Sequence, residues 1–307
     1  MNADIFEQYW TLRRGAGLLD LSARSRLVIT GADRKRFLHG QVTNDVNGLT
    51  VGQGCYAAIV SAKGKVESDV YMYCLENALL LDFEPGLAAR IAARIEKYVI
   101  ADDVQLEDVS GKYALLSVQG PQAADPNVPE KPLSFKQVGN AYYVNNPRGT
   151  KRGFDVFVPL AEKDALKLPG TPCSEAALDI VRIESGIPRF GVDMDETNLA
   201  PETGIESRAI SYSKGCYIGQ EVISRIRTYG QVAKALRGLR CDILPNHGDK
   251  LLLGGKEVGY VTSAAFSPVL KANIALGYVR REHNAMGTKL DGAEIVQLPF
   301  VNPEAAL

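Results

Sequence analysis

Apolar residues recur at helical spacing in several stretches of the chain, and each stretch predicts an amphipathic helix. Near the N-terminus, Ile5, Tyr9 and Leu12 line one side of such a helix, and glycines at 15 and 17 end it. Leucine 87 and the isoleucines at 91 and 95 repeat the pattern after a Pro-Gly pair that marks a helix start. The predicted helices span residues 4–14, 31–40, 87–99, 174–185 and about 221–229.

Shorter apolar runs, bounded by glycine, proline and polar residues, predict strands. Early in the chain they alternate with helices in the order β-α-β-β-α-β, the split βαβ or ferredoxin-like arrangement. A run at 78–83 either continues the third strand or adds another. From residue 238 on, only strands are expected, and five or six short strands predict a small barrel. The predicted strands span residues 24–30, 55–61, 66–75, 78–83, 104–109, 113–119, 133–138, 141–144, 154–158, 238–243, 250–253, 257–263, 274–279 and 294–298.

These elements predict an α+β protein of three modules around a central cavity. A split βαβ module is expected over residues 1–110, a second α+β module over 111–230, and a small β-barrel over 231–307. The length of 307 residues suits two or three domains, at about 100–200 residues each.

The composition excludes several classes of protein. Hydrophobic residues make up 46% of the chain and charged residues 23%, which is ordinary for a soluble globular protein. The net charge of −1 gives no clear sign of nucleic-acid binding, and no apolar run predicts a membrane span. Five cysteines without a CxxC pair predict neither a disulfide framework nor a metal site. With no signal peptide in the polar N-terminus, we expect a cytoplasmic protein.

The most informative run is KGCYIGQE at residues 214–221. It places Cys216 between two glycines, two residues after Lys214 and directly before Tyr217. We expect the thiol on a tight turn that enters a helix, where the helix dipole and Lys214 would both favour the thiolate. The alternative is an inert free cysteine in the core, since free cysteines are among the most buried residues.

Glu184 forms a second signal, because it falls on the apolar side of the helix at 174–185, one turn beyond Ile180. Ser174 is expected to cap this helix. A carboxylate on an apolar side needs hydrogen-bond donors, because an unpaired buried charge is costly. Either it caps local backbone N–H groups, or it faces a ligand with two adjacent N–H donors.

The KGCYIGQE run resembles the signature of the YgfZ branch of the YgfZ/GcvT family, whose members bind folate and are tied to iron–sulfur cluster assembly and repair. Similarly, Arg182-x-Glu184-x-Gly186 matches the Arg-x-Glu-x-Gly motif of GcvT-type proteins. The resemblance assigns Glu184 to gripping the folate pterin, whose pyrimidine edge offers two N–H donors. It also implies that Arg182, Lys214 and Tyr217 help to bind the cofactor.

A second resemblance concerns residues 64–70, which match the Gly-Gly-x-x-Asp-Asp stretch of aminomethyltransferases. Asp69 matches the second aspartate, which makes it a candidate catalytic residue, and Ser68 replaces the first. The alternative is a solvent-facing residue on an alternating strand. Asn44 and Asp45 resemble the Thr-Asn-Asp segment of the family, which is expected near the central cavity.

The resemblance therefore implies a protein that binds tetrahydrofolate or a one-carbon derivative and assists the assembly or repair of iron–sulfur clusters in client enzymes. Cys216 is the candidate reactive residue, at the edge of the folate pocket. One cysteine cannot hold a cluster alone, since clusters are usually held by about four thiolates, so any cluster would be shared with a partner. The alternative is an aminomethyltransferase that uses Asp69, and whether there is turnover stays open.

Overall fold

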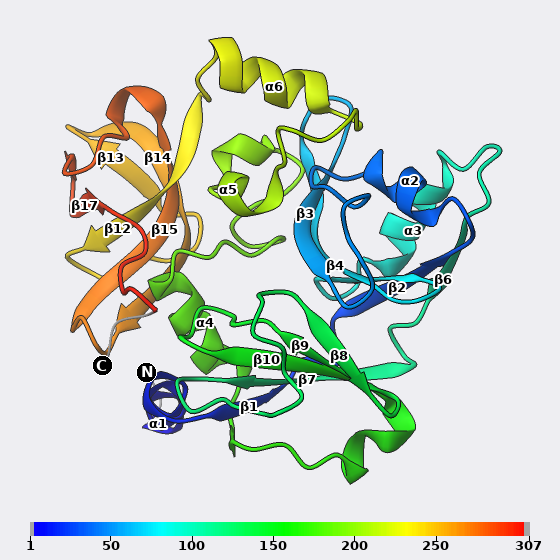
Figure 1. Cartoon of the computed structure of the whole chain (residues 1–307). Coiled ribbons are helices and arrows are strands. Elements are labelled where there is room, and N and C mark those ends of the chain that lie inside the picture. Colours follow the sequence, from blue (N-terminus) through cyan, green and yellow to red (C-terminus); the bar gives the residue numbers. More distant parts are fainter. Residues whose placement is uncertain (1–2, 304–307) are drawn as a thin grey trace.

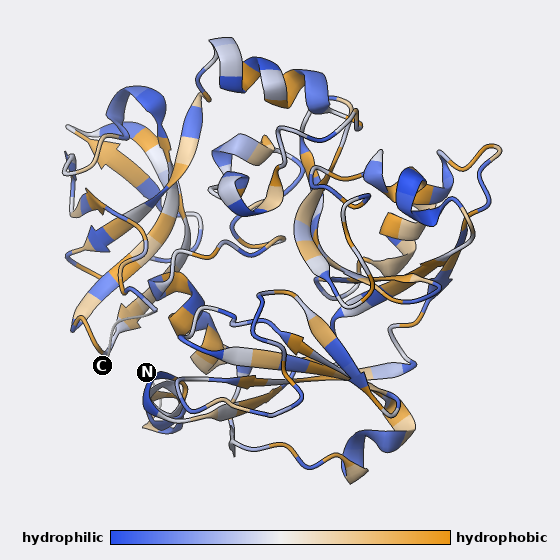
Figure 2. Cartoon of the chain, in the orientation of Figure 1, coloured by the Kyte–Doolittle hydropathy of each residue, from blue (hydrophilic) through white to orange (hydrophobic). Residues whose placement is uncertain are grey.

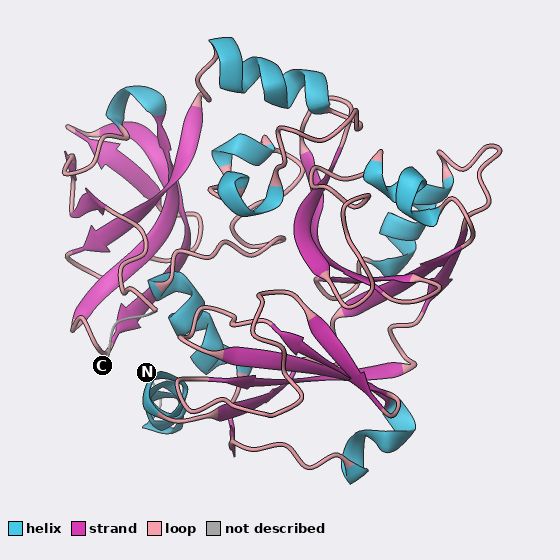
Figure 3. Cartoon of the chain, viewed as in Figure 1, coloured by secondary structure: helices cyan, strands magenta, loops and turns pink. Residues whose placement is uncertain are grey.

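The computed structural model describes residues 3–303, and these form an α+β fold with three sheets arranged around the centre of the molecule (Figure 1). Strands dominate, and the helices lie mostly at the periphery of the sheets (Figure 3). No helix within this range is both long and apolar enough to cross a bilayer.

The first unit is a five-stranded antiparallel sheet in the order β3-β4-β5-β2-β6, with two helices packed on it. It confirms the strands and helices predicted for this part of the chain, and β5 adds a strand between β4 and β2. Its elements are β2 (Ser25–Thr30), α2 (Arg34–His39), β3 (Gly54–Val60), β4 (Val66–Cys74), β5 (Leu79–Phe83), α3 (Ala88–Glu96) and β6 (Gln105–Asp108).

The second unit is a six-stranded sheet in the order β11-β1-β7-β10-β9-β8. Its elements are α1 (Ala3–Arg14), β1 (Gly17–Asp20), β7 (Tyr113–Gln119), β8 (Phe135–Val138), β9 (Ala141–Asn145), β10 (Gly153–Pro159), η1 (Leu160–Ala165), β11 (Thr171–Pro172) and α4 (Glu175–Glu184).

The N-terminal residues correct the predicted boundary at residue 110. Strand β1 pairs antiparallel with β7 and parallel with β11, and α1 packs on α4. Residues 3–20 therefore belong to the second unit, although they precede the first in sequence. No strand was predicted at residues 17–20, and the two strands that pair with β1 begin about 100 and 150 residues later in the sequence.

The third unit is a six-stranded sheet in the order β13-β14-β15-β12-β17-β16. Its edge strands β13 and β16 come close together, so the sheet is a nearly closed small barrel, as predicted. Its elements are β12 (Lys234–Cys241), β13 (Lys250–Leu253), β14 (Lys256–Ser267), β15 (Ala272–Arg280), η3 (Arg281–His283), β16 (Lys289–Leu290) and β17 (Ala293–Val296).

A connecting segment between α4 and β12 carries η2 (Ala200–Glu202), α5 (Glu206–Ala209) and α6 (Gln220–Tyr229). Helix α6 spans the space between the barrel and the first unit (Figure 1) and carries both hydrophobic and hydrophilic residues (Figure 2). Only Ile223 of α6 is buried, and Tyr229 is 88% exposed. The predicted amphipathic helix exists, but little of its apolar side is covered.

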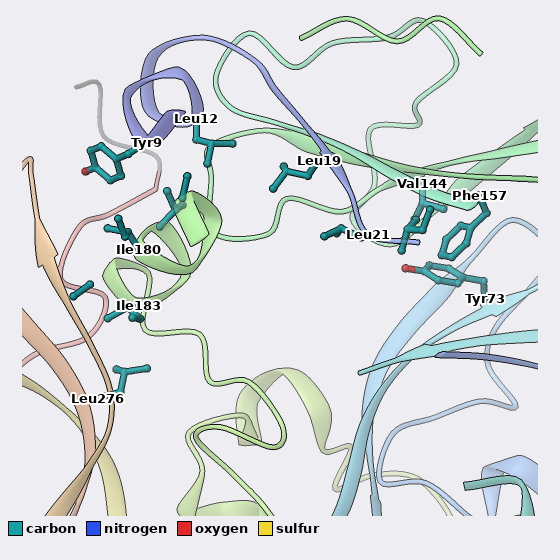
Figure 4. Packing of buried hydrophobic residues seen from close by; sticks show 14 of the residues in the cluster. Tyr9, Leu12, Leu19, Leu21, Tyr73, Val144, Phe157, Ile180, Ile183 and Leu276 are labelled. Atoms are coloured by element: carbon teal, nitrogen blue, oxygen red, sulfur yellow. The ribbon is translucent and has the colours of Figure 1, made fainter. Parts of the chain in front are cut away.

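One hydrophobic cluster joins all three units (Figure 4). Tyr9 and Leu12 of α1 and Ile183 of α4 belong to it, together with Tyr73 of the first unit and Leu276 of the barrel. Each of these five residues is at most 1% exposed. Because the units share this core, their side chains meet at the centre in a fixed arrangement.

Candidate functional site

A cavity of about 610 Å³ lies where the first unit, the second unit and the connecting segment meet. This volume is within the range of about 300–1,000 Å³ typical of small-molecule sites. The polar and charged residues that line it are Arg24, Tyr56, Asp69, Tyr71, Glu84, Asn145, Asn146, Arg148, Thr150, Glu175, Asp179, Arg182, Ser185, Arg189 and Arg208.

Asp69 lies on β4, is 9% exposed and lines this cavity. Tyr56, on the neighbouring strand β3, donates its hydroxyl to Oδ2 of Asp69 at 2.8 Å, while Oδ1 has no hydrogen-bond partner among the described residues. Burial raises the pKa of Asp69 to about 6, and Glu84 adds to the rise while Arg24 and Tyr56 oppose it. The carboxyl can therefore exchange a proton near neutral pH.

The neighbours of Asp69 on β4 are not part of the cavity. Ser68 is fully buried, and its hydroxyl donates to the main-chain oxygen of Asp69. Glu67 pairs with Arg94 at 2.9 Å. Asp69 is thus the carboxylate that this strand brings to the cavity, and the predicted solvent-facing alternative does not describe it.

A ladder of ion pairs forms one wall of the cavity. Arg24 bonds Asp82 at 2.8 Å and Glu84 at 2.6 Å, and Arg189 bonds Glu84 at 2.7 Å. Burial raises the pKa of Asp82, against the effect of Arg24 and Arg148. Since Arg189 lies in the connecting segment after α4 and the other three belong to the first unit, this ladder links that segment to the first unit across the cavity.

Arg182, predicted to bind the cofactor, does line the cavity, but its guanidinium is engaged by the protein. Its Nε bonds Asp179 at 2.7 Å, one Nη pairs with the buried Asp193, and the other donates to Ser263 of the barrel at 2.6 Å. Arg182 thus anchors α4 to the barrel.

Glu184 is fully buried and is not among the residues that line the cavity. Its carboxylate accepts hydrogen bonds from Tyr9 and Ser267 and pairs with the buried Arg13. Its donors are therefore side chains of α1 and the barrel, rather than local backbone N–H groups or a ligand in this cavity. Ser174 occupies the N-cap position of α4, but its hydroxyl donates to Gln8 and makes no cap.

The KGCYIGQE loop lies on the first unit, and none of its residues lines the cavity. Lys214 Nζ donates to the carbonyl oxygens of His39, Val42 and Asn44 at 2.5–2.9 Å. Burial lowers the pKa of Lys214 to about 8. This cation therefore fixes the loop to the end of α2, where the sequence suggested a role in forming the thiolate.

The other two predicted residues of this loop, Tyr217 and Cys216, differ in their exposure to solvent. Tyr217 is 7% exposed, with its ring 4.9 Å from Lys214 Nζ. Cys216 is exposed, so the predicted inert core cysteine is not what the fold contains. Helix α6 begins four residues later, at Gln220, after Gly219 in the left-handed conformation (φ 82°). The turn and the helix after the thiol are thus confirmed.

Asn44 and Asp45 lie beside the site rather than in the cavity wall. Asn44 Nδ2 donates to the main-chain oxygens of Tyr56 and Arg208, at 2.9 and 3.2 Å. Asp45 Oδ1 accepts from the backbone of Gly48. Asn44 thus holds Tyr56 and Arg208 next to each other. Both residues line the cavity, and neither was predicted from the sequence.

Two family models match the chain: the GCVT N-terminal domain over residues 1–126, and the glycine cleavage T-protein C-terminal barrel domain over residues 234–301. An aminomethyltransferase of Saccharopolyspora erythraea is 30% identical, covering 96% of this chain and 89% of that protein. One from Thermosipho melanesiensis is 28% identical, covering 96% and 88%. A putative chloroplastic transferase of Arabidopsis thaliana is 26% identical, covering 91% and 69%.

Among solved structures, the glycine cleavage system aminomethyltransferase T from Bartonella henselae matches with a TM-score of 0.84. The match covers 97% of this chain and 89% of that one, at 21% identity. At this identity the likeness shows the fold alone, and it extends over all three units.

Proposed function

The chain belongs to the glycine cleavage T-protein family, and on that basis we propose that its cavity binds tetrahydrofolate or a one-carbon derivative. The protein would then act in one-carbon transfer of the aminomethyltransferase type, with Asp69 as its acid–base residue. The observation that carries this proposal is the carboxyl of Asp69, which lines the cavity with one oxygen unpartnered and a pKa of about 6.

The chemistry of the cavity supports a folate. A general acid or base works best when its pKa lies near the working pH, and Asp69 meets this condition. Tyr71, a partly exposed residue of the cavity wall, offers aromatic surface to a planar ring. Among the lining residues, Arg208 suits an anionic ligand, because it forms no ion pair with a carboxylate within residues 3–303. Glu184 takes no part in this proposal, because its carboxylate is bound by other side chains.

The test is calorimetric titration with tetrahydrofolate, followed by an assay of transfer from an aminomethyl-lipoyl carrier to tetrahydrofolate. We expect binding, and transfer that Asp69→Asn lowers at least about 100-fold, as for loss of a general acid or base. Absence of binding in the wild type would end the proposal. Binding with no transfer would remove the aminomethyltransferase activity and leave the folate site.

The position of Cys216 favours a second candidate function, assistance in the assembly or repair of iron–sulfur clusters. Cys216 is the exposed thiol of a loop that Lys214 fixes to the first unit. An exposed thiol can attack an electrophile or ligate iron together with thiolates of a client enzyme. This candidate requires Cys216 and does not require transfer by Asp69.

The two candidates are separated by complementation of a strain that lacks the protein. For the cluster function, wild type and Asp69→Asn restore the activity of sensitive iron–sulfur enzymes, and Cys216→Ser does not. For one-carbon transfer alone, Cys216→Ser behaves as wild type. A Cys216→Ser variant that restores those enzymes fully would exclude the second candidate.

A further inference from the structure

Five arginines line the cavity, and four of them are paired with carboxylates of the protein. The paired ones are Arg24, Arg148, Arg182 and Arg189. Arg208, on α5, forms no ion pair with any carboxylate within residues 3–303. An arginine is always charged at physiological pH, so this wall presents to the cavity one positive charge that no carboxylate within residues 3–303 contacts directly.

Arg208 is held at the cavity wall by contacts that involve no carboxylate. Its guanidinium carbon lies 4.8 Å from the ring centroid of Tyr56. Asn44 bonds the main-chain oxygens of both residues. Thr43 donates its hydroxyl to the next main-chain oxygen, that of Ala209, at 2.6 Å. These hydrogen bonds fix the main chain around Arg208, and the ring of Tyr56 contacts its guanidinium, whose hydrogen-bond donors contact no carboxylate within residues 3–303.

Tyr56 connects this arginine to the acid–base residue, because its hydroxyl bonds Asp69 while its ring lies under Arg208. We propose that Arg208 is the carboxylate-binding residue of the cavity and holds an anionic group of the ligand beside Asp69. This inference rests on the proposed function for the identity of the ligand, but not for the arginine's affinity for a carboxylate. Arginine suits this role because its planar fork matches the two oxygens of a carboxylate.

Two sources can supply the carboxylate: the glutamyl tail of the folate, or an amino acid that donates the one-carbon unit in place of the aminomethyl-lipoyl carrier. Calorimetric titrations of wild type, Arg208→Gln and Arg208→Lys distinguish them with three probes. Tetrahydrofolate carries the glutamyl tail, tetrahydropteroate lacks it, and N-methylglycine carries a carboxylate without a pterin. Arg189→Gln is the matched control, because Arg189 lines the same cavity but is paired with Glu84.

We expect Arg208→Gln to weaken the carboxylate ligand by about 10- to 100-fold, as for loss of a charged hydrogen bond, with Arg208→Lys in between. Weaker tetrahydrofolate binding with unchanged tetrahydropteroate binding supports the proposal and assigns the glutamyl tail. Unchanged binding of both folates, with loss of N-methylglycine binding, supports it and assigns the amino acid.

Equal weakening of both folates would overturn the proposal, since Arg208 would then serve the pterin or only shape the wall. The proposal would also be overturned if Arg208→Gln bound all three probes as wild type does. It would be overturned likewise if N-methylglycine did not bind wild type and Arg208→Gln bound both folates with unchanged affinity. A wild type that binds neither folate contradicts the proposed function, and the N-methylglycine titration then decides Arg208 by itself. Thermal unfolding of each variant shows whether it is folded.

Discussion

The hydroxyl of Tyr9 donates to Oε1 of Glu184 at 2.9 Å and so joins α1 to the end of α4 across 175 residues of sequence. Arg13, with a side chain only 3% exposed, pairs with the same carboxylate, and Ser267 brings in the barrel. The carboxylate of Glu184 therefore joins the N-terminal helix, α4 and the barrel.

Glu184→Ala is expected to destabilise the protein by about 3–5 kcal/mol, because it leaves the buried guanidinium of Arg13 without its carboxylate. Urea unfolding measures this loss. Glu175→Ala is the matched control on the same helix, with a side chain 51% exposed, and should change stability by less than about 0.5 kcal/mol. A folded Glu184→Gln variant should keep its affinity for tetrahydrofolate. A tenfold loss of that affinity would contradict the structural role and restore Glu184 as a ligand-binding residue.

Helical periodicity correctly predicted that Glu184 is buried and that its carboxylate needs donors. It could not show where the donors come from, because Tyr9 and Ser267 lie 175 and 83 residues away. The same limit explains why β1 was not predicted as a strand, since its pairing partners lie about 100 and 150 residues away. Local pattern determines burial and element type, whereas partners are determined by the packing of the three units.

The cavity likewise contains one residue that the sequence predicted and one that it did not. Asp69 was found through a short motif, and it does lie on the cavity wall. Arg208 was missed, because an isolated arginine on a four-residue helix has no pattern to distinguish it from any surface arginine. Its significance depends on the absence of an ion pair, which only the arrangement of neighbouring side chains reveals.

Asp69→Asn should stabilise the protein above pH 6. The fold raises the pKa of Asp69 from 3.8 to about 6, so between these values the folded protein binds the proton more tightly than the unfolded chain. The contribution of Asp69 to stability therefore falls as the pH rises through this window. Above it, wild type carries a buried charge that the variant lacks.

We expect a gain of about 1–3 kcal/mol for Asp69→Asn at pH 7.5, and almost none near pH 4, measured by urea unfolding at both values. Glu221→Gln, at a side chain 89% exposed, is the control and should show no pH-dependent difference. A variant less stable than wild type at pH 7.5 would mean that the folded protein stabilises the charge of Asp69.

Tyr56→Phe should raise the pKa of Asp69 further. The Tyr56 hydroxyl donates to the carboxylate and so favours its charged form, and the phenyl ring keeps the packing but not the donor. A carbon-13 NMR titration of the Asp69 carboxyl should show a shift of up to about 1 unit upward. The acidic limb of any Asp69-dependent activity should move in the same direction.

Ser68→Ala is the matched control for this variant, since Ser68 is buried on the same strand but donates to the main-chain oxygen of Asp69. It should leave the titration of Asp69 unchanged. If Tyr56→Phe and Ser68→Ala move the titration equally, the effect comes from loosening of β4 and not from the hydroxyl of Tyr56.

Cys216 should be the first of the five cysteines to react with a neutral alkylating reagent such as iodoacetamide at pH 7.5. Cys74 is 2% exposed, and burial raises the pKa of Cys55 to about 12 and of Cys173 and Cys241 to about 11. A thiol with a pKa of 11 holds roughly 300-fold less thiolate than one at the usual value of about 8.5. Because the thiolate is the nucleophile, these residues react slowly, while Cys216 is exposed.

Peptide mass spectrometry after brief alkylation tests this order of reactivity. We expect one modification per chain, on the peptide with Cys216, and its loss in Cys216→Ser. Lys214→Ala separates the two roles considered for the cation, because it removes the donor to three main-chain oxygens that fixes the loop. If Lys214 only anchors the loop, alkylation of Cys216 stays as fast or becomes faster, since a looser loop is more accessible. If Lys214 instead promotes the thiolate, alkylation slows, and the steeper pH dependence of the rate would show that the thiol pKa has risen.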